Sequence, residues 1–123
     1  MLQPATLSLE TTARDAEVLT LDGPFDLSNA AAFELTISDL FEAGAPCVVV
    51  DLRGVSFLDS TMLRALVRVL RAAERRGGEG SFRIVRPNPV IWKVFVLTGL
   101  SGLFPAYPTL SKALAIPPDR TPA

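Results

Sequence analysis

The chain has 123 residues, of which 49% are hydrophobic, and this length suits one core rather than two ordinary domains. Twelve basic residues against thirteen acidic ones leave a net charge of -1, which argues against nucleic acid as a partner. Histidine is absent and Cys47 is the single cysteine, which excludes histidine-based catalysis, thiolate zinc clusters and intrachain disulfides. We therefore expect Cys47 to pack as a small core hydrophobe.

The N-terminus lacks a basic region followed by an apolar one, as a secretory signal would require. No apolar run approaches the roughly 20 residues that are needed to cross a bilayer. We therefore expect a cytoplasmic protein without membrane insertion.

Four segments have strand patterns. Residues 6–10 and 17–21 alternate apolar and polar side chains on either side of Arg14-Asp15, which predicts two half-exposed strands joined by a turn. Residues 46–52 form a nearly continuous apolar run, as expected for a strand covered on both faces within a mostly parallel sheet. Residues 80–86 are the fourth candidate.

Two helices are predicted in the middle of the chain. The first follows the capping candidate Ser28 and stops at Gly44. The second has apolar residues at i, i+3, i+4 and i+7 from Leu63 and ends at Gly77-Gly78. A row of arginines lies on another side of this helix, where a solvated face is the most common role. The row consists of Arg64, Arg68, Arg71 and Arg75.

Two further helices follow the last strand. One begins at Asn88-Pro89, a cap followed by a first-turn proline, and ends at Gly99, and the other covers residues 109–115. Strands that alternate with helices imply an α/β domain, here a mixed sheet packed with about four helices, whose first strand or two are antiparallel additions. We predict a single domain over residues 1–116 and a disordered tail over 117–123.

Asp59-Ser60-Thr61 lies where the apolar strand passes into the second helix. The first backbone N–H groups of a helix have no partner inside it, so this position favours capping oxygens and anions. Two interpretations stay open from the spacing alone. Asp59 or Ser60 is a helix cap with no other role, or Ser60 is a serine that can be phosphorylated.

A loop aspartate, Asp26, is predicted at the carboxyl ends of the strands, where α/β sheets usually have their sites. Together with Asp22 and Asp51 it suggests an alternative, a magnesium pocket with an aspartyl phosphoacceptor, as in response-regulator receivers. This alternative is weaker because no lysine ends a later strand; Lys93 falls inside the third predicted helix.

With these elements in order, residues 6–114 resemble the STAS family, the sulphate transporter and anti-sigma factor antagonist domain, in its free-standing form. Three segments carry the resemblance, and the second is by far the most specific. They are residues 21–26 (LDGPFD), 48–61 (VVVDLRGVSFLDST) and 97–100 (LTGL). The resemblance implies a bacterial regulator without catalysis, cofactor or metal of its own.

In antagonists of this family, a partner that is both an anti-sigma factor and a serine kinase phosphorylates the serine of the second motif. The resemblance assigns that role to Ser60 and places Asp59, Thr61 and Asp26 at the partner surface. It implies that phosphorylation switches the antagonist off. The alternatives are a STAS subunit of a lipid-transport or stress-signalling complex and the receiver-like phosphoacceptor; a homodimer also stays open.

Met62 departs from the family pattern, which usually has glycine after the serine pair. Because Met62 falls in the first turn of the second helix, we expect its side chain to point away from the sheet. An exposed methionine would suit a flexible contact, so Met62 is a fourth predicted partner-binding residue.

Overall fold

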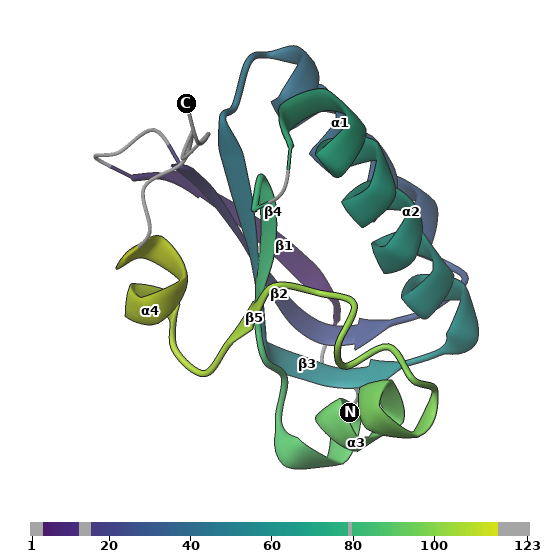
Figure 1. Ribbon diagram of the computed structural model, residues 1–123. Helices are drawn as coiled ribbons and strands as arrows, with labels where there is room; N and C mark the ends of the chain where they lie inside the picture. Colours follow the sequence, from purple (N-terminus) through teal and green to yellow (C-terminus); the bar gives the residue numbers. More distant parts are fainter. Residues whose placement is uncertain (1–3, 13–15, 79, 116–123) are drawn as a thin grey trace.

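The computed structural model describes residues 4–12, 16–78 and 80–115, which form a five-stranded sheet with four helices (Figure 1). β1 pairs antiparallel with β2, and the remaining neighbours are parallel, which confirms the mixed sheet with an antiparallel addition. The predicted turn at residues 14–15 and the predicted tail at 117–123 lie outside the described residues. In sheet order the strands are β1 (Thr6–Thr11), β2 (Ala16–Phe25), β3 (Cys47–Leu58), β4 (Phe82–Val85) and β5 (Ala106–Tyr107).

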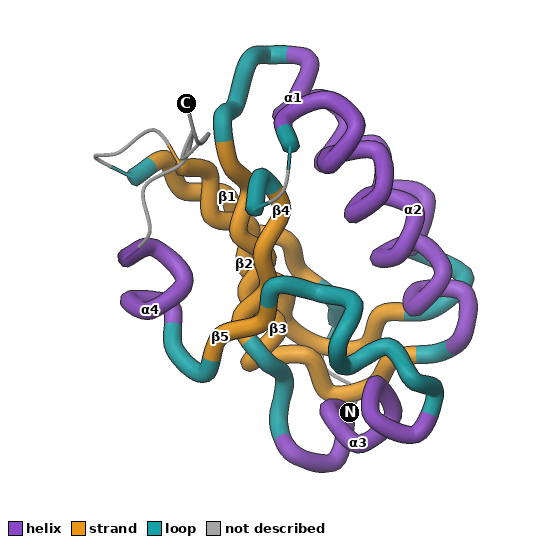
Figure 2. Tube along the Cα trace, in the orientation of Figure 1, coloured by secondary structure: helices purple, strands orange, loops and turns teal. Residues whose placement is uncertain are grey.

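The helices cover the two faces of the sheet unequally. Figure 2 shows α1 and α2 side by side on one face, α4 on the opposite face and α3 beyond the end of the sheet where α2 begins. α1 and α2 are the longer pair, and α4 has only 6 residues. The helices are α1 (Ala30–Glu42), α2 (Ser60–Gly77), α3 (Pro89–Leu97) and α4 (Leu110–Ala115).

β3 runs through the centre of the sheet and explains the continuous apolar run. Its alternate residues Val48 and Val50 face the main core under α1 and α2, whereas Cys47 and Val49 face the smaller cluster under α4. All four side chains are fully buried. Burial on both faces therefore removes the alternation that marks a half-exposed strand, and Cys47 packs as the small core residue predicted for it.

β2 and β3 both extend further than the sequence predicted. β2 continues through Phe25 and β3 through Leu58, with shifts in their pairing after Thr20 and after Gly23. These irregularities let the pairing continue past Pro24, which has no N–H to donate. The short β5 was not predicted because two residues carry no period.

Gly54 of β3 lies opposite Asp22 of β2 in the parallel pairing. A β-carbon built on Gly54 would collide with the carboxylate of Asp22, the residue that pairs with it on β2. The carboxylate of Asp22 therefore occupies the space that a side chain at position 54 would need.

Candidate functional site

Asp59 ties together the two segments that form the site. Its Oδ1 accepts a hydrogen bond from the backbone N–H of Met62 at 2.9 Å, and its Oδ2 accepts one from the N–H of Leu27 at 3.1 Å. Its own N–H donates to the carbonyl oxygen of Phe25 at 3.3 Å. Asp59 is thus the N-cap of α2 and also fixes the loop between β2 and α1.

The loop from Asp26 to Asn29 is held by its own side chains. Asp26 Oδ1 accepts from the N–H of Ser28 at 2.9 Å and from its hydroxyl at 2.6 Å, and these bonds lower the pKa of Asp26. Asn29 Oδ1 accepts from the N–H of Asp26, and its amide donates to the carbonyl oxygen of Pro24. Asp26 therefore stays charged and fixed at the surface.

The predicted cap of α1 was wrong in one respect. α1 begins at Ala30, with Asn29 as its cap residue, and no side chain bonds the free N–H groups there. Ser28 is not the cap because its hydroxyl donates to Asp26 within the loop. A serine before a helix can either cap it or bond a neighbouring loop residue, so its position alone did not identify the cap of α1.

Ser60 is the first residue of α2 and is exposed. Its hydroxyl makes no hydrogen bond to any residue that the structure describes. The sequence left open whether Asp59 or Ser60 caps α2, and the cap is Asp59. The Ser60 hydroxyl is therefore not used as a cap and is exposed to solvent. Thr61 follows it and is partly buried.

Met62 contradicts its predicted orientation. Its side chain is fully buried in the main core instead of pointing away from the sheet. Met62, Leu66, Val69 and Ala73 recur at i, i+4, i+7 and i+11, so Met62 belongs to the apolar face of α2. This extended period was the signal that should have placed it inside, and a buried side chain is not available to a partner.

Leu27 is a surface residue that the sequence patterns did not identify as part of the site. Its side chain is 75% exposed, while its N–H is bonded to Asp59 beside the start of α2. A leucine between a loop aspartate and a helix cap was the available signal. Asp59 thus joins two segments, one with the exposed Leu27 and one with the exposed Ser60.

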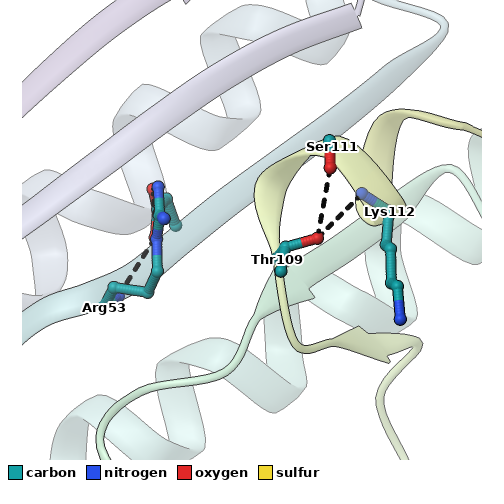
Figure 3. Close-up of polar contacts among 5 residues, drawn as sticks. Arg53, Thr109, Ser111 and Lys112 are labelled. Carbon is teal, nitrogen blue, oxygen red and sulfur yellow. Dashed lines mark hydrogen bonds and ion pairs between the residues drawn. The ribbon is translucent and has the colours of Figure 1, made fainter.

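The aspartate alternative does not gather a metal site. Asp51 is buried on β3, where it pairs with Arg53 through two oxygens, at 2.9 Å from Nε and 2.7 Å from a terminal nitrogen (Figure 3). This pair raises the pKa of Arg53. Within residues 4–12, 16–78 and 80–115, no cluster of three metal-binding side chains occurs. Lys93 lies inside α3, as predicted.

The other polar group drawn in Figure 3 is the cap of α4. Thr109 Oγ1 accepts from the N–H of Lys112 at 3.1 Å and lies 3.3 Å from the hydroxyl of Ser111. These residues lie on the opposite face of the sheet from α2.

Across the described segments, no helix is long and apolar enough to cross a membrane.

The mixed sheet of five strands with four helices is the fold that the resemblance to the STAS family predicted. Residues 8–113 match this family, so the chain belongs to the STAS domain family, as its sequence motifs indicated. The chain is 33% identical over 97 residues to the anti-sigma-F factor antagonist RsfB of Mycobacterium tuberculosis, covering 79% of this chain and 77% of RsfB.

Two solved structures extend the comparison. The crystal structure of an anti-sigma factor antagonist from Mycobacterium paratuberculosis has a TM-score of 0.81 and 31% identity, with 94% of this chain and 96% of that chain covered. The structure of SpoIIAA, a Bacillus cell fate determinant in its phosphorylated form, has a TM-score of 0.68. The match covers 89% of this chain and 97% of the SpoIIAA chain. At 24% identity, SpoIIAA shows similarity of fold alone.

Proposed function

We propose that this protein is an anti-sigma factor antagonist, which binds an anti-sigma factor in the bacterial cytoplasm and so releases a sigma factor. The observation that carries the proposal is the free hydroxyl of Ser60 at the exposed start of α2, beside a loop that Asp59 fixes. The similarity to RsfB and to the Mycobacterium paratuberculosis antagonist supports it.

The anti-sigma factor would also be the kinase that phosphorylates Ser60 and would supply the nucleotide. A phosphate adds about -1.5 to -2 charges at neutral pH. Next to the charged loop aspartate Asp26, this charge repels a partner surface built around a neutral hydroxyl. The unphosphorylated protein therefore binds, and the phosphorylated protein dissociates.

The residues around Ser60 would have different roles in binding the partner. Asp26 and Thr61 lie at the surface that meets the partner, and Asp59 acts through the positions of the backbone that it bonds. Leu27 adds an apolar contact, since a leucine exposed to 75% loses unfavourable hydration when a partner covers it. Met62 supports the first turn of α2 from within the core.

Affinity capture with the unphosphorylated protein, followed by mass spectrometry, would identify the anti-sigma factor. Incubating the purified pair with ATP and mapping phosphopeptides then tests the residue. We expect phosphate on Ser60. Phosphate on Thr61 with Ser60 unmodified would show that the assignment is wrong, and recovery of membrane transport proteins alone would favour a STAS subunit of another complex.

Charge at this position is tested by calorimetric titration of three variants against the captured anti-sigma factor. Ser60→Asp should weaken binding, whereas Ser60→Ala should retain it, because only the first adds charge. Ser111→Asp is the matched control, since it adds the same charge on α4 across the sheet. Equal affinities of the two Ser60 variants would contradict the charge switch.

A further inference from the structure

The positive charge of this protein is concentrated on α2. Five arginines against the single Glu74 leave α2 with a net charge of +4, so the rest of the chain must carry -5 to give the total of -1. Arg64, Arg68, Arg71 and Arg75 are all exposed. We name these four residues the arginine stripe.

The arginine stripe begins at the phosphorylation candidate. At 100° per residue, Ser60 and the four arginines at i+4, i+8, i+11 and i+15 fall within an arc of roughly 80° around α2. A partner that contacts the Ser60 hydroxyl and continues along the helix therefore meets the arginines in succession.

The surface beside the stripe is hollowed on two sides. Between α1 and α2, a groove of about 390 Å³ is lined by Glu34, Ser38, Arg68, Arg71 and Arg75 among others. A second hollow of about 280 Å³ lies between Arg64, Arg68 and the apolar side chains of Leu63, Val67 and Leu100. The stripe thus presents cationic groups next to apolar surface.

One carboxylate already lies on the stripe. Arg68 forms a two-pronged ion pair with Glu34 of α1, at 2.7 Å from Nε to Oε1 and 3.1 Å from a terminal nitrogen to Oε2. Arg71 and Arg75 form no ion pair with any residue in the described part of the chain. Both arginines line the same groove.

From these observations we infer that the arginine stripe docks an acidic, amphipathic segment of the anti-sigma factor, whose carboxylates pair with Arg71 and Arg75 and whose apolar side chains enter the hollow at Leu100. This inference rests on the proposed function for the identity of the partner. A protein segment fits better than nucleic acid or an anionic membrane, because the remaining -5 charge repels an extended polyanion while a short segment meets only the stripe.

Charge reversal in the captured anti-sigma factor complex is the first test. Arg71→Glu/Arg75→Glu should weaken binding by about tenfold or more and slow association most at low salt, because exposed charges act mainly through steering. Lys93→Glu/Lys112→Glu, which reverses the same charge on α3 and α4, is the control and should change affinity by less than about threefold. Circular dichroism and urea unfolding would verify that both variants fold. Equal affinities of the two double variants would overturn the inference.

A second test does not depend on the proposed function. The ¹⁵N-labelled protein is titrated with a synthetic amphipathic helical peptide that has glutamates on its polar face, and with the same peptide carrying glutamines. The glutamate peptide should shift α2 amides saturably and bind about tenfold more tightly than the glutamine peptide. Equal binding of the two peptides, or equally tight binding of double-stranded DNA or phosphatidylserine vesicles, would overturn the inference. Failure to capture any anti-sigma factor would instead contradict the proposed function. The peptide titration would then still test whether the arginine stripe binds an acidic segment.

Discussion

Removing the Asp59 carboxylate should destabilise the fold more than most surface substitutions. Its two oxygens bond the N–H of Met62 at 2.9 Å and that of Leu27 at 3.1 Å. Loss of an N-cap costs about 1 kcal/mol, and a net hydrogen bond contributes about 0.5–1.5 kcal/mol. Because Leu27 lies at the surface, its freed N–H can bond water, so its share falls at the lower end. We expect Asp59→Ala to lower the free energy of unfolding by about 1.5–2 kcal/mol.

Urea unfolding at pH 7 measures this change, and two further variants define its origin. Asp59→Asn keeps the cap but removes the charge and one acceptor oxygen, so it should lose about half as much. Asp39→Ala should change the free energy of unfolding by less than about 0.5 kcal/mol, because Asp39 is exposed on α1 and its side chain bonds no residue that the structure describes. Hydrogen exchange at the Leu27 amide should accelerate in Asp59→Ala and in Asp59→Asn, because both lose the oxygen that accepts from it, but not in Asp39→Ala. A loss below 0.5 kcal/mol for Asp59→Ala, with unchanged exchange at Leu27, would refute the bridging role.

Three further predictions concern single side chains. Met62→Ala should lower the free energy of unfolding by about 2–5 kcal/mol in urea, because it leaves a cavity in the main core; a loss under 1 kcal/mol would contradict its burial. The bonds from Ser28 hold the pKa of Asp26 below its ordinary 3.8, so their contribution to the free energy of unfolding is present above pH 3.8 and is lost as the pH falls through the lower folded value. Asp26→Asn should therefore make the urea midpoint less sensitive to acid, and an unchanged acid profile would count against this role of Asp26. Burial raises the pKa of the Cys47 thiol above 9.0, so the protein should lose stability above pH 9, where the thiol of the unfolded chain ionises. The buried thiol should also react with Ellman's reagent only as fast as the protein unfolds, and immediate labelling of the native protein would contradict this.

The order of the main elements and the place of the candidate site follow from local sequence patterns. The apolar run at residues 46–52 identifies β3, and the apolar period from Leu63 with Gly77-Gly78 at its end identifies α2. These patterns are local, so they can be read without knowledge of the rest of the chain. The motif around Ser60 indicated the family for the same reason, because strand, cap and helix are contiguous there.

Which side chains are exposed depends on contacts between segments that are far apart in the sequence. Asp59 is the cap and the bridge to Leu27 because two loops 32 residues apart in sequence meet, and no local pattern reports that meeting. Met62 is buried because α2 packs its wide apolar face on both the sheet and α1, so that a residue one position before the expected core also falls inside. The groove beside Arg71 and Arg75 exists because α1 lies against α2. Burial and surface charge depend on which elements pack together, and packing is a property of the whole chain.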